Sequence, residues 1–356
     1  MKIISSAQMG KGTFEAKFIP LSKLSFIEKI YIVRDKVGPN IDKVEYIVLP
    51  RVISRFKPLK IFIPFIIAKH TIQKKCGLII GYHIVPHAFF AFVASLLSRT
   101  PFACAQTGIY IQRQSQNKIF GFFLKEVLRK ALFINVPGQM SRDFWFNFGL
   151  EPSKINILHS TIDTYRFSNN NLEKVFDFII LSRLSEEKRI EHLLNIFHKM
   201  KSEGHNFTVC IAGDGPRAEY LKALTDELNL GDIISFVGFV DNPEVWFNKS
   251  KIFLLSSQSE GFPTALMQAM SCGLVCVSTN VGNISDTIVQ NQNGFLVDYG
   301  NWGGYKDILI QLLEKLESTE FKKIADKARE DVVKNHSIDF AIREWEKVFK
   351  NYFTEK

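Results

Sequence analysis

Apolar runs alternate with helix-like patterns in the second half of the chain. The first run covers residues 175–181, and Ile190, Leu193, Leu194 and Phe197 then recur at the spacing of one helix face. Four more apolar runs follow, at residues 207–212, 233–237, 252–255 and 274–277. Buried strands that alternate with amphipathic helices are typical of a parallel sheet covered on both faces. The pattern predicts an α/β, doubly wound, Rossmann-like domain.

The first half is less regular, but it predicts a second domain of the same class. Apolar segments suited to strands lie at residues 29–33, 46–49, 78–80, 102–105 and 132–135. The polar stretch 168–171 reads Ser-Asn-Asn-Asn and makes the best linker. We therefore expect an N-terminal domain over 1–167 and a C-terminal domain over 168–336. Helical patterns at 303–317, 320–334 and 338–353 close the chain, and we expect the segment 337–356 to pack back toward the N-terminal domain.

Length and composition fit a folded protein of two domains. The chain has 356 residues, of which 46% are hydrophobic and 23% charged. No apolar run reaches the roughly eighteen residues of a membrane span, and the first residues lack the apolar core of a signal peptide. The five cysteines are scattered, without a Cys-x-x-Cys pair. We expect a cytoplasmic protein without disulfides or a bound metal.

The positive charge is concentrated in the first half. Residues 1–168 contain 24 Lys and Arg against 9 Asp and Glu, a net charge of +15, whereas the whole chain has +9. Such asymmetry indicates an anionic partner. We expect no nucleic acid, because no recognised binding motif occurs. Segments 55–75 and 118–133 join Lys and Arg to apolar faces, which suits an anionic membrane surface, although these faces could equally form the domain core.

Residues 256–273 carry the strongest functional pattern of the chain. They follow the apolar run at 252–255 and lead into a helix with Pro263 near its first turn. The free amides of Thr264, Ala265 and Leu266 would form an anion site at that helix start. Glu260 lies just outside it, and Gln268 lies one turn inside on the face of Thr264. The alternative is that Glu260 only caps the helix and Gln268 is an ordinary polar residue.

Other loops of the predicted sheet would reach the same edge. Ligands of open α/β sheets bind where loops leave the carboxyl ends of the strands. Arg183 and Lys188 follow the first strand of the C-terminal domain and could neutralise a diphosphate, or could be surface residues near a helix start. The remaining loops bring Gly213, Gly215, Gly238, Phe239 and Gly261. Gly213 and Gly215 let a backbone approach a ligand closely, or form only a tight turn.

Taken together, these segments resemble the retaining glycosyltransferases of family 4, which have the two-domain GT-B fold. The matching segments are residues 181–188, 211–216, 236–240, 260–273 and 293–297, with weaker similarity at 136–138 and 157–164. The resemblance implies two Rossmann-like domains that face each other across a cleft. It also implies a nucleotide-sugar donor, UDP- or GDP-linked, held mainly by the C-terminal domain without a metal.

The resemblance also implies roles for individual residues. Arg183 and Lys188 would bind the diphosphate, and Glu260 would bind the sugar hydroxyls. Donor contacts would further come from Gly10, Gly12, Gly213, Gly215, Gly238, Phe239, Gly261, Phe262, Pro263, Thr264, Ala265, Leu266 and Gln268. The acceptor would bind the N-terminal domain, where His83 and His87 are candidates for contacts with acceptor or sugar. A lone histidine is more often structural.

Two departures from the family pattern keep alternatives open. The second glutamate of the family's motif is Gln268 here, and an amide accepts weaker hydrogen bonds than a carboxylate. The segment 101–108 lacks the histidine that many relatives have after this strand. We predict a retaining hexosyltransferase for cell-surface glycans, such as lipopolysaccharide or capsule, with a glycan or lipid-linked acceptor. The alternatives are a nucleotide-sugar epimerase of similar fold and a non-catalytic sugar-nucleotide-binding subunit.

Overall fold

The chain folds into two compact α/β units. The computed structural model describes residues 1–107, 111, 115, 117–261 and 263–353. The first unit contains Met1–Thr161 together with Ile338–Lys356, and the second contains Ile162–Ser337. Each unit is described below by itself. Within the described residues, no helix is both long enough and apolar enough to cross a membrane.

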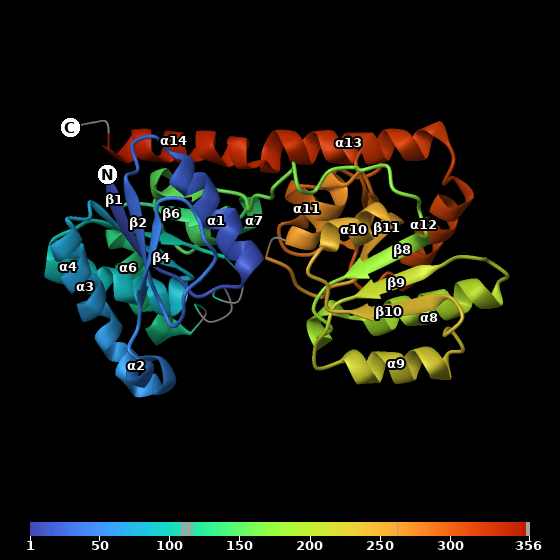
Figure 1. The fold of residues 1–356 in the computed structure, drawn as a ribbon, viewed down its shortest axis with the longest axis horizontal. Coiled ribbons are helices and arrows are strands. Elements are labelled where there is room, and N and C mark those ends of the chain that lie inside the picture. Colours follow the sequence, from blue (N-terminus) through green and yellow to red (C-terminus); the bar gives the residue numbers. More distant parts are fainter. Residues whose placement is uncertain (108–110, 112–114, 116, 262, 354–356) are drawn as a thin grey trace. The chain divides into compact units, whose positions relative to one another are not determined.

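The first unit is built on a parallel sheet with strand order β3-β2-β1-β4-β5-β6-β7 (Figure 1). Its strands are β1 (Lys2–Ser6), β2 (Lys29–Arg34), β3 (Val44–Val48), β4 (Leu78–Tyr82), β5 (Phe102–Ala105), β6 (Ile134–Val136) and β7 (Ile155–Ile157). Five of these strands lie where the apolar segments predict them. The sequence pattern missed β1, which ends in two serines, and β7, which has only three residues.

Helices cover both faces of this sheet. They are α1 (Lys11–Lys23), α2 (Arg51–Arg55), α3 (Ile63–Lys74), α4 (Phe89–Ser98), α6 (Lys118–Lys130), α7 (Gln139–Asn147) and α14 (Ile338–Phe353), with short helical turns η1 (Lys57–Phe62), η2 (Ile84–Ala88) and η3 (Pro152–Lys154). Neighbouring strand residues point to opposite faces. Ile3 therefore packs in one core with Phe14 of α1 and Trp345 of α14, while Ile4 packs in the other with Ile67 of α3 and Leu124 of α6.

The amphipathic basic segments of this unit have one buried side and one exposed side. In α6, Leu124 and Leu128 are buried, whereas Phe122 and Phe123 are exposed. The segment that includes η1 and α3 follows the same rule: its exposed apolar side chains are Phe56, Ile61, Phe62, Phe65 and Ile72. Part of each apolar face thus forms the domain core, which was one of the two alternatives. The other alternative, an anionic membrane surface, stays a prediction.

The second unit has a parallel sheet with strand order β10-β9-β8-β11-β12-β13 (Figure 1). Its strands are β8 (Phe176–Leu181), β9 (Val209–Ala212), β10 (Ile234–Gly238), β11 (Ser250–Leu255), β12 (Val275–Thr279) and β13 (Phe295–Val297). The apolar runs predict the first five of these strands. Strand β13 was missed because it has only three residues. The predicted fold class, two Rossmann-like parallel sheets with helices, is confirmed.

The helices of the second unit connect these strands and cover both faces. They are α8 (Ile190–Ser202), α9 (Ala218–Glu227), α10 (Pro243–Asn248), α11 (Thr264–Ser271), α12 (Trp302–Glu314) and α13 (Thr319–His336), with short turns η4 (Glu186–Lys188) and η5 (Ile284–Asp286). Side-chain caps fix two of their starts: Asn301 accepts from the Gly304 amide, and Ser318 accepts from the Phe321 amide. Two cores, one on each face, contain Leu193 and Met270 respectively.

The strand orders identify where each sheet can bind a ligand. In the second unit the chain runs outward from β8 through β9 and β10 and then returns to place β11 on the other side of β8. In the first unit it runs outward from β1 through β2 and β3 and returns to place β4 beside β1. Open α/β sheets bind ligands at such switch points, beyond the carboxyl ends of the two diverging strands.

Candidate functional site

The loops after β8 and β11 meet at the switch point of the second unit through an ion pair. Lys188 Nζ lies 2.6 Å from Glu260 Oε1, and the side chains are only 19% and 10% exposed. Ser257 Oγ donates a second hydrogen bond of 2.6 Å to the same oxygen. Oε2 of Glu260 makes no hydrogen bond with a described residue. One carboxylate oxygen is thus held in place, and the other remains able to accept hydrogen bonds.

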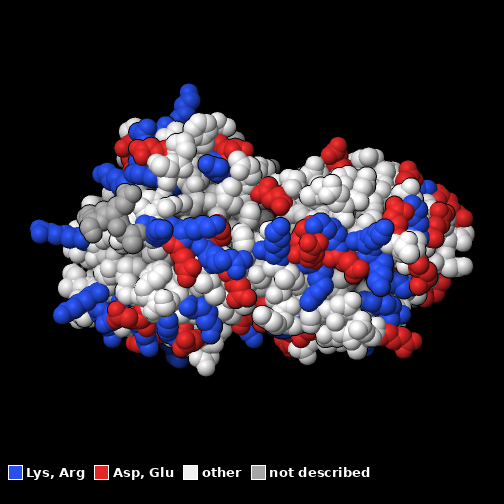
Figure 2. Space-filling view, turned by 90° about the horizontal axis from the view of Figure 1, so that it is seen from above, with Lys and Arg blue, Asp and Glu red and all other residues white. Residues whose placement is uncertain are grey.

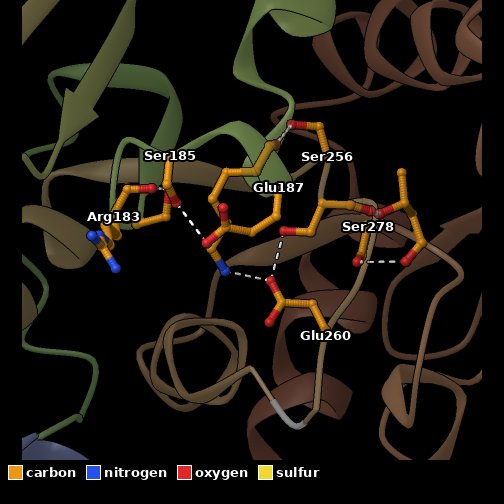
Figure 3. A network of polar contacts seen from close by, with 10 residues as sticks. Arg183, Ser185, Glu187, Ser256, Glu260 and Ser278 are labelled. Atoms are coloured by element: carbon orange, nitrogen blue, oxygen red, sulfur yellow. Dashed lines mark hydrogen bonds and ion pairs between the residues drawn. The ribbon is translucent and has the colours of Figure 1, made fainter. Parts of the chain in front are cut away.

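Further bonds tie the same two loops together. Ser256 Oγ donates to the Lys188 carbonyl at 2.8 Å (Figure 3). The Gln258 amide donates to the Glu187 carbonyl at 2.8 Å. Because these bonds fix the backbone on both sides of the ion pair, Lys188 and Glu260 are positioned before any ligand arrives. Such preorganisation lowers the cost of ordering the site on binding.

Glu187 adds a carboxylate beside Lys188. Ser185 Oγ donates to Glu187 Oε1 at 2.7 Å. This hydrogen bond, with smaller contributions from the charges of Lys188 and Arg183, lowers the pKa of Glu187. Glu187 therefore stays ionised at neutral pH, and the loop after β8 carries a negative charge among its positive ones.

Arg183 belongs to the same loop but stands apart from the network. Its side chain is exposed and extends away from Glu260 (Figure 3). The guanidinium of Arg183 makes no hydrogen bond or ion pair with a described residue. The structure therefore brings Lys188 and Glu260 together and leaves the Arg183 guanidinium free to meet a ligand.

Two predicted glycines hold the loops after β8 and β9 close together. A Cβ on Gly213 would lie 1.8 Å from the Ser182 carbonyl oxygen, and one on Gly215 would lie 2.4 Å from that of Leu184. The φ angle of Gly213 is +136°, which side chains rarely allow. In this structure both glycines allow two backbone segments to lie in direct contact.

The loop after β10 joins the same edge. The Gly213 amide donates to the Gly238 carbonyl at 2.7 Å, and Gly238 has a φ of +70°. The next residue, Phe239, is 74% exposed. A large aromatic ring open to solvent at this edge is available to pack on a ligand.

Helix α11 begins at Thr264, with Pro263 at the N-cap position. Its first backbone bond runs from the Met267 amide to the Pro263 carbonyl, so the amides of Thr264, Ala265 and Leu266 precede the helical ladder. Gln268 is half-buried, and its side chain has no hydrogen-bond partner among the described residues. Phe262, which the sequence places in the same site, lies outside the described residues.

Three residues that support this site were not named as site residues from the sequence, although segments 256–273 and 280–283 were placed at this edge. Ser257 binds Glu260 directly, and Asn283 Nδ2 donates to the Gly261 carbonyl at 2.9 Å. Gly282 passes so close that a Cβ would lie 1.8 Å from the Glu260 carbonyl oxygen, and its φ is +64°. The available signals were a serine two residues after a buried strand and a glycine three residues after the next one.

The predicted histidines lie at the switch point of the first unit. His87 Nδ1 lies 2.6 Å from Ser6 Oγ at the end of β1, and His83 Nε2 lies 3.0 Å from the Gln8 carbonyl oxygen. The Thr107 hydroxyl also hydrogen-bonds to His83. Burial lowers the pKa of His87 to about 3 and lowers that of His83. Both imidazoles are therefore neutral at pH 7, and both connect the loops after β1 and β4.

Gly10 and Gly12 flank the start of α1 at the same edge. Gly10 is the N-cap residue, without a side-chain cap, and its carbonyl accepts from the Phe14 amide at 2.9 Å. A Cβ on either glycine would have no heavy atom within 4 Å. The space beside the first turn of α1 is therefore open.

Residues 161–331 match the family model described as "Glycosyl transferases group 1". The match covers the second unit except for its last residues and includes Lys188, Glu260 and the start of α11.

This segment of the chain belongs to the group 1 glycosyltransferases. The match confirms, for the second unit, the family that the sequence motifs indicate.

Two relatives align with different shares of this chain. N-acetyl-alpha-D-glucosaminyl L-malate synthase of Bacillus anthracis is 29% identical over 171 residues, which are 48% of this chain and 44% of that protein. The alignment thus spans less than half of that relative. N-acetylgalactosamine-N,N'-diacetylbacillosaminyl-diphospho-undecaprenol 4-alpha-N-acetylgalactosaminyltransferase of Campylobacter jejuni is 24% identical over 325 residues, 86% of this chain and 88% of that protein.

The fold has close counterparts among solved structures. Anabaena Alr3699/HepE, in complex with UDP-glucose, superposes with a TM-score of 0.78 at 17% sequence identity, covering 98% of this chain and 99% of that one. At this identity the likeness supports the shared GT-B fold alone.

Proposed function

We propose that the chain is a retaining glycosyltransferase that transfers a sugar from a nucleotide-sugar donor to a lipid-linked or polysaccharide acceptor during cell-surface glycan synthesis. The observation that carries this proposal is the Lys188–Glu260 pair at the switch point between β8 and β11. A cation and a carboxylate side by side suit a ligand that joins a diphosphate to a sugar.

The proposed donor contacts follow from the charges at this edge. Lys188, the free guanidinium of Arg183 and the first amides of α11 would bind the diphosphate. Glu260 would accept hydrogen bonds from sugar hydroxyls through Oε2, while Oε1 stays on Lys188 and Ser257. Phe239, with its exposed ring, would face the base.

In the proposed reaction the bond from the sugar C1 to the diphosphate breaks and a bond to the acceptor oxygen forms on the same face. The acceptor hydroxyl proton passes to the departing phosphate oxygen, which balances the step. Lys188 and Arg183 contribute most in the transition state, because negative charge grows on the leaving diphosphate there.

UDP- or GDP-linked sugars are the proposed donors. The similar fold of Anabaena Alr3699/HepE, solved with UDP-glucose, supports this class. Gln268 replaces the second carboxylate of the family's motif, and neutral hydrogen bonds are about half as strong as charge-assisted ones. We therefore propose weaker binding at the ribose end of the donor than two carboxylates would give.

The acceptor is proposed to bind the first unit, at a site on the cytoplasmic face of a membrane. The loop that carries His83 and His87, the proposed acceptor or sugar contacts, lies at the switch point of that sheet, and the loop with Gly10 and Gly12 beside it would contact the donor. The name of the Campylobacter relative includes a diphospho-undecaprenol acceptor. A lipid-linked acceptor lies in a membrane, and the exposed apolar side chains of α6 and η1 suit binding to a membrane surface.

A thermal-shift panel of nucleotide sugars tests the proposal. A ligand that binds only the folded chain raises its free energy of unfolding by mass action, by about 2.7 kcal/mol at a concentration a hundredfold above the dissociation constant, and so raises the unfolding temperature. We expect UDP- or GDP-sugars to stabilise the chain and Lys188→Met to reduce the effect. Release of an altered sugar nucleotide without an acceptor would instead indicate an epimerase.

A further inference from the structure

An open hollow lies in the second unit where β12 and β13 reach their carboxyl ends. Its volume is about 350 Å³, which is a usual size for a ligand pocket. Asn280 directly follows β12 and Asp298 directly follows β13, and the two strands pair with Thr279 opposite Val297. The carboxyl ends of the strands form the edge at which open α/β sheets bind ligands. The hollow therefore lies where this class of fold places binding sites.

The polar side chains that line this hollow offer hydrogen bonds that the chain itself leaves open. Gln290 Oε1 and Asn301 Oδ1 each accept from a backbone amide, at 2.6 and 3.0 Å. Each of these two side chains is thereby held through its oxygen, and its NH2 group makes no hydrogen bond with a described residue. The Asp298 carboxylate and the Asn280 side chain also have no partner among the described residues. The hollow thus presents both donors and an ionised acceptor.

The composition of the hollow indicates a neutral ligand that is rich in hydroxyl groups. Among the described residues that line it, none is Lys, Arg or His, so no cation there would pair with a phosphate or a carboxylate. Its apolar lining comes from Leu296, Val297 and Ile308. A sugar ring combines hydroxyls, which both donate and accept hydrogen bonds, with apolar C–H groups. A carboxylate, side-chain amides and an apolar lining match that combination.

The hollow is distinct from the proposed donor site, although hydrogen bonds connect the two. Thr279 Oγ1, at the end of β12, donates to the Ser257 carbonyl at 2.7 Å, and Ser257 Oγ in turn holds Glu260. Asn280, the next residue along the chain, lines the hollow. None of the described lining residues is among those proposed to contact the donor. A ligand bound here would therefore contact loops that are bonded to the donor site without occupying that site.

We propose that this hollow binds a neutral sugar unit of a glycan chain, separate from the sugar of the nucleotide-sugar donor. Asp298 accepts hydrogen bonds from the sugar hydroxyls, and the NH2 groups of Gln290 and Asn301 donate to sugar oxygens. This inference goes beyond the proposed function, which places the donor sugar at Glu260 and the acceptor on the first unit. The same chemistry could instead serve the sugar of the donor, and the experiment separates the two sources.

Saturation-transfer NMR with neutral sugars tests the inference, because it detects weak binding directly. The probes are glucose, galactose, N-acetylglucosamine and maltose, added to the whole chain with and without UDP or GDP. We expect saturation transfer from at least one of these sugars, unchanged by the nucleoside diphosphate. Asp298→Ala should weaken that binding about tenfold or more, since it removes a charge-assisted hydrogen bond. Asp307→Ala, at an exposed aspartate of α12 outside the hollow, is the matched control and should leave binding unchanged.

Three results would overturn the inference. They are an absence of saturation transfer from all four sugars, equal transfer in Asp298→Ala and the native chain, or transfer that a nucleotide sugar abolishes while the matching nucleoside diphosphate does not. The last result would assign the sugar to the donor site. Should Asp298→Ala not fold, Asn280→Ala provides the same comparison at the neighbouring strand end. Because the sugars are also titrated without nucleotide, failure of every nucleotide sugar to bind would count against the proposed function alone.

Discussion

Single side chains at the two switch points fall into two groups, those that are paired and those that await a partner. Lys188 and Glu260 neutralise each other, and His87 is satisfied by Ser6. The Arg183 guanidinium makes no hydrogen bond or ion pair with a described residue. Because it is exposed, it is available to an anionic group of a bound substrate.

Sequence reasoning could place Lys188 and Glu260 at one edge, because each follows an apolar run and parallel strands share their carboxyl ends. It could not find Ser257, whose role depends on a contact of its hydroxyl with Glu260. Nor could it find the bond that Asn283 Nδ2 donates to the Gly261 carbonyl, which joins the loops after β12 and β11. Contacts between distant segments decide both roles, and local patterns carry no signal for them.

His87 should make stability fall in acid. Its pKa is about 3 in the folded chain against 6.5 ordinarily, so below pH 6.5 the unfolded chain binds a proton that the folded chain refuses. Stability from this group is therefore complete above pH 6.5 and is lost as the pH falls toward 3. Between pH 6 and 4, the native chain should lose about 1.4 kcal/mol per pH unit more than His87→Asn. Denaturant titrations of both proteins at several pH values measure the difference, and equal slopes would contradict it.

At the scale of elements, the apolar pattern predicted most strands but not the shortest ones. Strands β7 and β13 have three residues each, too few for a run to stand out from neighbouring loops. Their places are set by pairing, with Ile134 opposite Ile155 and Val277 opposite Phe295. The helices near the C-terminus were predicted well, because long amphipathic patterns with polar starts are distinctive.

The loop after β12 should be essential to the shape of the site. Gly282→Ala forces a Cβ to within 1.8 Å of the Glu260 carbonyl oxygen, in addition to the roughly 1–2 kcal/mol that a positive φ costs. Gly204→Ala has a similar φ of +91° but open space, so it isolates the cost of φ. We expect Gly282→Ala to lower stability more than the control and to weaken nucleotide-sugar binding. Chemical denaturation and calorimetry would show this, and indistinguishable variants would refute it.

At the scale of the whole molecule, the net positive charge comes from the first half of the sequence. On the face drawn in Figure 2, positive and negative side chains alternate over both units. The excess of Lys and Arg in residues 1–168 accompanies the exposed apolar side chains of α6, η1 and α3. This combination supports a membrane-facing surface of the first unit.

Liposome sedimentation tests that surface. We expect binding that requires anionic lipid and weakens with salt, because screening reduces the attraction between exposed charges. Replacing both Phe122 and Phe123 by Ser should weaken binding at least about tenfold, since each ring loses apolar burial. Tyr165→Ser, at an exposed aromatic of the second unit, is the control. Equal binding to neutral vesicles, or none, would exclude this part of the account.

The most direct measurement of the central claim is calorimetric titration of the chain with its best nucleotide sugar and with the matching nucleoside diphosphate. If Glu260 binds the sugar hydroxyls, the native chain prefers the nucleotide sugar, and Glu260→Gln loses about tenfold of that preference because a charge-assisted bond becomes a neutral one. Glu203→Gln, at an exposed glutamate of the same unit, should retain it. A native chain without any preference, or a Glu260→Gln variant that keeps all of it, would contradict the account.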